Sequence, residues 1–417
     1  TFGAGKITTG TVFSDEDIAN IASVRRNVQD FAQLDSRMYL GSLDQGGNLS
    51  AQGQNFRFNS FLIDGVQAND TFGLNGNGFS SLRSPIPPEA MLALNTELSP
   101  YDARRAGFTG ALMNAVTKSG TNQLRGSVYY EYTDQDWRAK NPVTKVRDTF
   151  KESTFGATLG EPILPGKLFF FASYDHFKRE IAPPSQNFVP DSAIVQAITT
   201  KAGTYGSFNP GSFSASNEPF QKIYLGKLDW NIVPGHRASF TYRKNEGQDT
   251  VFSNFSGATT TSFSTEWYDQ PRKTDSYTGQ LFSTWTPNLR TEVSASFTKY
   301  DGSPASRSDG KFPEVQIQNV SGRRLDTGAA ITNGAVYFGT EFSRQLNAIT
   351  TKTRNATFAA DYSLGDHTFM FGGDYEKTEI TNKFVQAFLG SYTFTNPAAW
   401  TAGTASNLQV AVLAPGA

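Results

Sequence analysis

Hydrophobic and polar residues alternate with a period of two along much of the chain after residue 122. In Leu289–Tyr300, the charged side chains of Arg290 and Glu292 fall on one face, and Val293 and Phe297 fall on the other. Successive side chains of a strand point to opposite faces, so this pattern predicts a strand with one apolar face. Eight more segments have this pattern: Gly126–Tyr132, Phe155–Gly160, Leu168–Phe177, Lys222–Trp230, Arg237–Lys244, Tyr277–Trp285, Ala356–Tyr362 and His367–Tyr375. We therefore expect about nine amphipathic strands in residues 123–417.

The links between these segments alternate between short and long. The short links, 161–167, 231–236, 286–288 and 363–366, contain Pro or Gly, most of them together with Asn or Asp, which are turn residues. The long links span about 134–153, 179–220, 246–275 and 301–352. Outer-membrane barrels have short periplasmic turns and long extracellular loops, whereas a soluble β-sandwich has no physical reason to sort its loops by end. The spacing therefore predicts antiparallel, up-and-down transmembrane β-barrel strands.

The two faces of the strands agree with this interpretation. A face toward lipid must be apolar, because unpaired polar groups in hydrocarbon cost several kcal/mol each. The opposite face can line a wet lumen or meet a plug, and it carries polar side chains: Arg237, Arg243, Arg290 and Glu292. Aromatic residues near strand ends are expected in interfacial belts or in edge packing: Trp230, Tyr242, Trp285, Tyr300, Tyr362 and Tyr375.

The first 122 residues follow a different pattern, which predicts a small mixed domain. Ser14 precedes three acidic residues and can cap a helix, and apolar residues then recur at spacings of three and four as far as Phe31. This predicts one helix, or two short helices separated near Ser23. Asp64-Gly65 predicts a tight hairpin, since both turn positions tolerate positive φ. The alternation in Leu92–Leu98 predicts a half-buried strand, preceded by a short helix at Pro87-Pro88-Glu89.

A loop rich in Gly and Asn, residues 73–78, follows Asn69-Asp70. It is interpreted either as a flexible connection or as an apex loop that faces a ligand, and both interpretations stay open.

Several short motifs together resemble the plug domain of TonB-dependent outer-membrane receptors. They are Asp64-Gly65-Val66, Asn69-Asp70, Gly107-Phe108-Thr109-Gly110-Ala111 with Asn114, and Val116-Thr117-Lys118-Ser119-Gly120-Thr121-Asn122 followed by Gly126. The resemblance covers roughly the first 130 residues, and it is specific as a group of motifs. By this resemblance the plug-motif residues are Asp64, Gly65, Asn69, Asp70, Gly107, Gly110, Asn114, Thr117, Lys118, Ser119, Gly120, Thr121 and Asn122. The chain is most similar to the large receptors that usually carry a carboxypeptidase-regulatory-like domain ahead of the plug.

The resemblance implies a fold and a function. The fold is mainly β, with a small α+β plug domain in residues 1–122 followed by the N-terminal part of a transmembrane barrel in residues 123–417. The function is energy-coupled uptake of a scarce ligand across the Gram-negative outer membrane. The ligand is a peptide, an oligosaccharide or a metal chelate, with a slight preference for peptide or carbohydrate breakdown products. The implied partners are a TonB-type periplasmic protein, outer-membrane lipid and an extracellular ligand of unknown class. Neither the upstream domain nor the box that contacts TonB is recognisable.

Composition removes other classes of function. The chain has 417 residues, a net charge of -1 and no Cys, so neither a basic surplus for nucleic acid nor a disulfide framework is present. Mean hydropathy is -0.41, and no run of about 18 apolar residues predicts a membrane-spanning helix. Three His residues without an HExxH motif do not indicate a zinc hydrolase. Gly3-Ala4-Gly5-Lys6 lacks the spacing of a phosphate loop, and no catalytic pair of acids is evident. We expect no enzymatic activity, no cofactor and no metal site.

About nine strands are too few for a plugged barrel, which needs about 22, and an odd number is unusual for bacterial single-chain barrels. Residues 398–417 are predicted as loop rather than as a closing strand. We therefore expect this chain to be the N-terminal part of a longer receptor. Two alternatives remain: a passive, structural or adhesive barrel, and a secreted β-rich binding protein.

Overall fold

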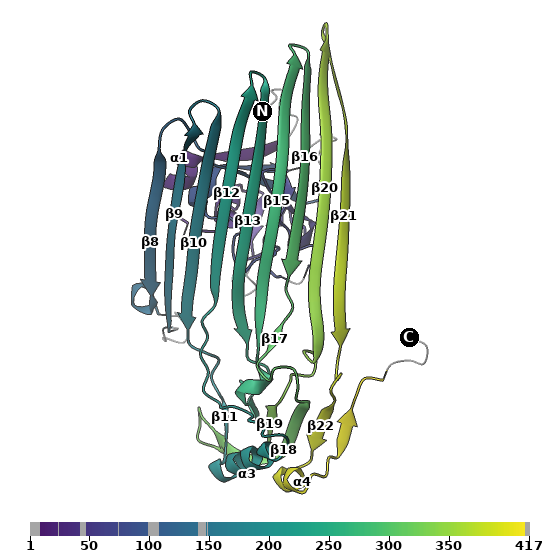
Figure 1. Cartoon of the computed structure of the whole chain (residues 1–417). Coiled ribbons are helices and arrows are strands. Elements are labelled where there is room, and N and C mark those ends of the chain that lie inside the picture. The colour runs from purple at the N-terminus through teal and green to yellow at the C-terminus, as the bar shows by residue number, and fades with distance from the viewer. Residues whose placement is uncertain are drawn as a thin grey trace.

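The computed structural model describes residues 9–23, 25–41, 47–73, 75–98, 108–140, 147 and 149–412. A curved sheet of nine long antiparallel strands, which we call the wall, dominates the described part (Figure 1). Its strands, in both sequence and spatial order, are β8 (Arg125–Asp134), β9 (Phe150–Leu164), β10 (Leu168–Ile181), β12 (Phe220–Val233), β13 (His236–Val251), β15 (Tyr268–Thr286), β16 (Leu289–Asp301), β20 (Leu346–Leu364) and β21 (His367–Val385). The short strand β17 (Ala305–Ser306) pairs with β15, and the 3₁₀ helix η4 (Gln135–Trp137) follows β8. The predicted fold class is confirmed.

All nine predicted strands are present in the wall, and each is longer than predicted. The added length lies mostly at the ends far from the short turns, in polar stretches such as residues 245–250 of β13. Backbone pairing continues there without an apolar face, so hydrophobic periodicity gives no signal. The four short links all lie at one end of the wall (Figure 1).

The outer face of the wall is the apolar face. Exposed apolar side chains recur on it in every strand from β8 to β20 except β10: Val128, Phe155, Leu159, Leu228, Phe240, Leu281, Val293 and Phe358. Among the predicted belt residues, Trp230, Trp285, Tyr362 and Tyr375 are exposed. Tyr300 is not a belt residue, since it is only 5% exposed. It faces inward because residues an even number of positions apart in a strand share a face, and Ser294 and Thr298 of β16 face inward.

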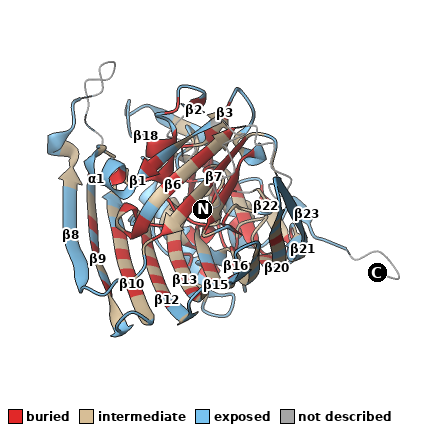
Figure 2. Cartoon of the chain, turned by 90° about the horizontal axis from the view of Figure 1, so that it is seen from above, coloured by how far each residue is buried: buried red, intermediate tan, exposed pale blue. Residues whose placement is uncertain are grey.

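The barrel is not closed in this chain. Each edge strand, β8 and β21, pairs with one neighbour only, so the wall is an open, curved sheet (Figure 2). No helix among the described residues is long and apolar enough to cross a membrane.

The long links were predicted as loops, and this prediction is wrong in part. Beyond the ends of the strands, three of them and the segment after β21 fold together into one unit, which we call the loop module, at the end of the wall opposite the short turns (Figure 1). Its elements are β11 (Phe188–Pro190), α3 (Ser192–Gly203), β14 (Thr260–Ser262), η5 (Ser264–Glu266), β18 (Glu314–Arg324), β19 (Ala330–Phe338), β22 (Ser391–Phe394), α4 (Pro397–Ala402) and β23 (Asn407–Gln409). The sheet order is β14-β19-β18-β22-β23, with β11 also paired to β18, and the β14/β19 and β18/β22 pairs are parallel.

The loop module has its own hydrophobic core, which includes Phe188, Ile198, Val336, Phe338 and Trp400. The core residues come from three links and from the segment after β21, so the core forms only when these segments pack together. That is why periodicity within one link did not reveal the module. The predicted loop at residues 398–417 is corrected for the same reason, since α4 and β23 lie in its described part.

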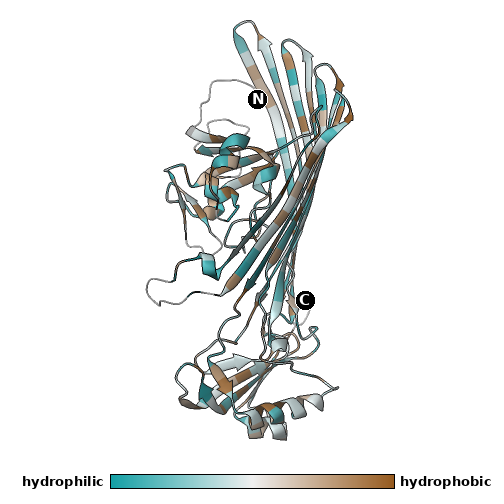
Figure 3. Cartoon of the chain, turned by 90° about the vertical axis from the view of Figure 1, so that its left-hand side faces the viewer, coloured by the Kyte–Doolittle hydropathy of each residue, from teal (hydrophilic) through white to brown (hydrophobic). Residues whose placement is uncertain are grey.

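The described residues between 9 and 117 form a compact N-terminal unit on the concave side of the wall (Figures 2 and 3). Its elements are β1 (Thr9–Ser14), α1 (Asp15–Asn20), α2 (Val28–Ala32), β2 (Met38–Leu40), β3 (Leu49–Ala51), η2 (Phe56–Phe58), β4 (Ser60–Ile63), β5 (Val66–Gln67), η3 (Pro88–Ala90), β6 (Met91–Leu98) and β7 (Ala111–Thr117). The main sheet has the order β1-β6-β7-β4-β5, in which only β4 and β7 are parallel, and β2 pairs with β3.

Local predictions for this unit are largely confirmed. Two short helices separated near Ser23 replace one long one, and Ser14 caps α1 in a capping box with Asp17. The strand predicted from Leu92 buries Leu94, Thr96 and Leu98 on one face as expected. Leu92 itself is exposed, because the pairing of β6 with β7 shifts register beside it.

Candidate functional site between the N-terminal unit and the wall

Polar groups make most of the specific contacts between the N-terminal unit and the wall. Hydrogen bonds from wall side chains to the unit include Lys227 Nζ to Thr117 Oγ1 (2.9 Å), Gln221 Nε2 to Ser84 O (2.9 Å), Thr274 Oγ1 to Ser80 O (2.9 Å), Arg272 Nε to Asn75 Oδ1 (2.6 Å) and Gln280 Nε2 to Asp64 O (3.1 Å). Among wall residues, Phe171 and Leu225 also join the apolar core of the unit. The interface is therefore mainly a set of hydrogen bonds around a small apolar contact.

Asp64 is central to this interface, and the local fold explains its position. Asp64 and Gly65 form the two-residue turn between β4 and β5 with φ values of 50° and 81°, the positive φ that such a turn needs. Asp64 Oδ1 accepts from Thr117 N at 2.8 Å, and Oδ2 accepts from Thr117 Oγ1 at 2.6 Å. Gly65 N donates to Asn114 Oδ1 at 3.2 Å. The fold thus brings together four of the predicted residues: Asp64, Gly65, Asn114 and Thr117.

Lys227 of β12 completes this group from the wall side. Its ammonium lies 3.6 Å from Asp64 Oδ2, and both side chains are more than nine-tenths buried. Arg243 of β13 also interacts electrostatically with Asp64. One carboxylate of the N-terminal unit therefore faces two basic side chains of the wall.

The segment after β7 crosses to the end of the wall that carries the short turns. Lys118 N donates to Ala90 O at 2.9 Å, and Asn122 Oδ1 accepts from Gly166 N of the β9–β10 turn at 2.7 Å. Gly120 lies against β10, where a Cβ would approach Phe170 O to 2.3 Å, so only Gly fits. Ser119 and Thr121 are exposed. Gly120 and Asn122 therefore connect the unit to the wall, whereas the backbone of Lys118 is bound to the unit itself.

Asn69 and Asp70 organise the loop of residues 69–78. Asn69 bridges the backbone, accepting from Phe61 N at 2.7 Å and donating to Asn59 O at 3.0 Å. Asp70 Oδ2 accepts from both the backbone and the side chain of Asn75, at 2.7 and 2.9 Å. The two residues therefore build the loop, and a role in contacting ligand stays a prediction.

Gly110 belongs to a close packing contact with Asn59, since a Cβ there would lie 2.2 Å from Asn59 Oδ1. That oxygen accepts from Ala111 N at 2.9 Å, which fixes the start of β7. Gly107, the remaining motif residue, lies outside the described residues.

A second charged group lies on the β8 and β10 side of the unit. Arg26 pairs with Glu89 of the unit and with Glu131 of β8, and its guanidinium stacks over the Tyr129 ring at 4.5 Å. Arg83 lies 3.8 Å above the ring of Phe177. Burial lowers the pKa of Arg83, and the nearby carboxylates of the wall oppose this effect.

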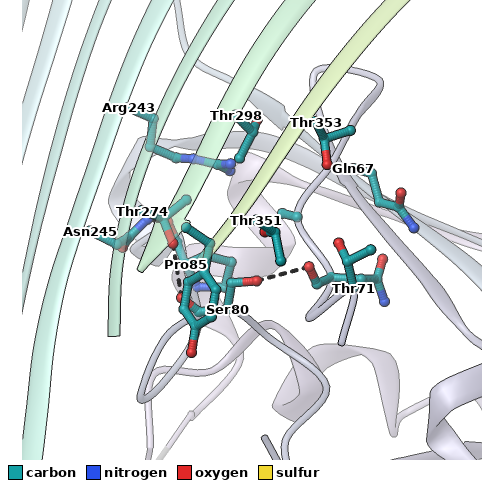
Figure 4. Close-up of a pocket in the computed structure, with 13 residues that line it drawn as sticks. Gln67, Thr71, Ser80, Pro85, Arg243, Asn245, Thr274, Thr298, Thr351 and Thr353 are labelled. Carbon is teal, nitrogen blue, oxygen red and sulfur yellow. Dashed lines mark hydrogen bonds between the residues drawn. The ribbon is translucent and has the colours of Figure 1, made fainter. Parts of the chain in front are cut away.

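A polar cavity separates the unit from β13, β15, β16 and β20 (Figure 4). Its space, including what is open to solvent, is about 470 Å³. Hydroxyl and amide side chains predominate in its lining: Gln67, Asn69, Thr71, Ser80, Asn245, Thr274, Thr298, Tyr300, Thr351 and Thr353. Arg243 is the one charged residue among the described residues that line it.

Motif resemblance did not identify Lys227 and Arg272 as interface residues. The alternation along β12 could have identified Lys227, because it lies on the same strand face as Gln221 and Asp229. These polar and charged residues indicate the inward face, although Ile223 and Leu225 make that face partly apolar. Among the described residues, no group of three or more His, Cys, Asp or Glu side chains is placed to hold a metal ion.

Comparison with known proteins places this geometry in a family. The family model of the outer membrane beta barrel domain matches residues 116–212 and 194–416. The TonB-dependent transporter Oar of Myxococcus xanthus is 29% identical over 262 residues, which cover 58% of this chain and 24% of Oar.

Solved structures share the fold. The outer membrane transporter YddB of Escherichia coli superposes with a TM-score of 0.68 at 14% identity, covering 96% of this chain and 51% of YddB. The siderophore receptor PirA of Acinetobacter baumannii gives a TM-score of 0.54 at 16% identity, covering 89% of this chain and 48% of PirA. The chain thus spans about half the length of these structures. From the family match, the chain belongs to the outer membrane β-barrel domain family, whose place is the outer membrane of Gram-negative bacteria.

Proposed function

We propose that this chain is the plug domain and the N-terminal part of the barrel of a TonB-dependent transporter. In this proposal residues 1–122 form the plug, residues 123–417 begin the barrel, and the motif residues around Asp64 and Thr117 hold the plug in place. The short turns face the periplasm and the loop module faces the outside, as in other outer-membrane barrels. The relationship to a TonB-dependent transporter supports the proposal.

The observation that carries it is the polar character of the interface between the N-terminal unit and the wall. A neutral hydrogen bond contributes only about 0.5–1.5 kcal/mol net, and one to a charged group about 1.5–3 kcal/mol, because water replaces it when it breaks. A unit held mainly by such bonds can be displaced and can return, whereas a large dry core would resist displacement. Force from a periplasmic TonB-type protein, driven by the inner-membrane proton gradient, would disturb the plug so that the ligand passes.

We also propose that the native receptor is longer than this chain. The edges of β8 and β21 are unpaired here, and open sheet edges are untenable in hydrocarbon because backbone groups have no partners there. Further strands would close the barrel between these two edges. By resemblance, we place the receptor in the subgroup with an upstream carboxypeptidase-regulatory-like domain.

The ligand classes in the proposal are peptides, oligosaccharides and metal chelates. The test is uptake of labelled mixtures of each class by Gram-negative cells that express the full gene. We expect uptake of one class to stop when a protonophore collapses the gradient or when the TonB-type protein is deleted. Uptake that continues under both treatments would instead identify a passive barrel.

A further inference from the structure

The cavity between the N-terminal unit and the wall contains an unusual charged group. Arg243 is 4% exposed and lines this cavity, and its Nε and Nη1 atoms have no hydrogen-bond partner among the described residues (Figure 4). The Oδ1 atom of Asn245, which lines the same cavity, also has no partner among them. Buried polar groups are normally hydrogen-bonded, and a buried charge without a partner is costly. These unpaired atoms indicate a binding partner that is not among the described residues.

Asp64 does not fill this role. Both of its carboxylate oxygens accept hydrogen bonds from Thr117, and Oδ2 also lies 3.6 Å from Lys227. Asp64 therefore offsets the charge of Arg243 only through space, while Nε and Nη1 of the guanidinium have no hydrogen-bond partner among the described residues. Lys227 and Arg243 carry two positive charges, and Asp64 carries one negative charge, so this group of three has a net charge of +1.

We propose that this cavity is a subsite for a carboxylate group of the transported ligand, with Arg243 as its anchor. The inference rests on the proposed transport function and adds a chemical class to it. The planar guanidinium presents parallel N–H donors that match a carboxylate in bidentate geometry. A singly charged anion fits better than a phosphate dianion, because Arg243 is the one charged residue among the described lining residues.

The rest of the lining suits a polar ligand that is otherwise uncharged. Thr298, Thr351 and Thr353 contribute hydroxyl groups from the wall, and Gln67 and Asn69 contribute amides from the N-terminal unit. Both components of the interface thus take part in the site. A bound carboxylate would therefore leave the site when the unit moves.

The test is binding to the native gene product, purified from outer membranes in detergent. The probes are N-acetylalanine and its uncharged amide, which differ in the carboxylate, and saturation-transfer NMR measures their affinities. We expect the acid to bind about 10-fold or more tightly than the amide, the range for hydrogen bonds to a charged group. Arg243→Gln should abolish this preference, and Arg243→Lys should retain part of it because the charge remains without the fork.

Arg237→Gln is the matched control, since Arg237 lies on the same face of β13, is exposed and does not line the cavity. It should leave the preference unchanged. Equal binding of acid and amide, or a preference that survives Arg243→Gln, would overturn the proposal, and stronger competition by inorganic phosphate than by acetate would overturn the choice of carboxylate. The binding assay needs neither a proton gradient nor TonB. A negative result would therefore contradict the carboxylate subsite alone, whereas the uptake experiment tests energy coupling separately.

Discussion

A single carboxylate, Asp64, connects three parts of the molecule at the scale of individual residues. It fixes the turn of its own hairpin, it holds the end of β7 through Thr117, and it lies between Lys227 and Arg243 of the wall. Motif resemblance predicted Asp64 and Thr117 as plug-motif residues, each from its own short motif, but not that they contact each other. Their wall partners could not be predicted, since they lie 110 and more residues away and depend on how the strands pack.

Asp64→Asn should destabilise attachment of the N-terminal unit by about 3–5 kcal/mol, because it leaves buried cations without their counter-charge. Adding Lys227→Met should recover part of this loss. The measurement is a double-mutant cycle on the urea dependence of proteolysis of the unit. Glu180→Gln, which removes a partner of Lys178 in an exposed pair, is the control and should change little. Additive effects of Asp64→Asn and Lys227→Met would contradict the coupling.

Glu266 is the corresponding buried acid in the loop module. Its Oε1 accepts from Asn254 Nδ2 at 3.0 Å, and its Oε2 has no partner among the described residues. Burial, together with the carboxyl groups of Glu314 and Glu341, raises the pKa of Glu266 well above its ordinary value of 4.5. The folded state therefore binds this proton more tightly than the unfolded state.

The stability of the loop module depends on pH through Glu266. The contribution of Glu266 to stability is fully present below pH 4.5 and is lost as pH rises through its raised pKa. Glu266→Gln should therefore stabilise the module at pH 7.5 and flatten its pH profile. Thermal unfolding followed by the fluorescence of Trp267 and Trp400 measures this. A variant less stable than the wild type at pH 7.5 would show that Glu266 is not held in its protonated form.

At the scale of elements, the sequence predicted the wall strands because each carries its own alternating face. It did not predict the loop module, because the core residues of that unit come from three links and the segment after β21, and the alternation within each is too short to indicate a strand. Strand ends were also missed, since polar pairing beyond the apolar band leaves no hydrophobic pattern. Tyr300 shows the same limit for a single residue. Its aromatic ring near a strand end predicts a belt residue, but the alternation of faces along β16 places it against the N-terminal unit.

The faces of β16 can be tested directly. Val293 is exposed on the outer face, whereas Ser294 faces inward and contacts Thr357 through its hydroxyl at 2.5 Å. Val293→Lys should cost about 2–4 kcal/mol, the penalty for a cation facing lipid near mid-bilayer. Folding into lipid vesicles, followed by the heat-dependent shift on gels, gives the comparison. If Ser294→Lys impairs folding more than Val293→Lys, the two faces are assigned the wrong way round.

At the scale of the whole molecule, a polar interface joins the N-terminal unit to the wall. The wall and the loop module are each held together by continuous backbone pairing or by a dry core, whereas the N-terminal unit is held to the wall mostly by side-chain hydrogen bonds. That difference in bonding makes the N-terminal unit the part that can move while the barrel remains intact. In the proposed function, this unit is the part that energy coupling displaces.

The most direct measurement uses the absence of Cys in the chain. Ser84→Cys places one thiol at a site that is 4% exposed, beside Gln221 of the wall, and Ser119→Cys places one at an exposed control site. Maleimide labelling is then compared in energised cells, with and without a protonophore. We predict that labelling at position 84 rises in energised cells that contain the TonB-type protein and falls to background with the protonophore, while position 119 labels equally throughout. Labelling at position 84 that ignores both the gradient and the TonB-type protein would contradict the account.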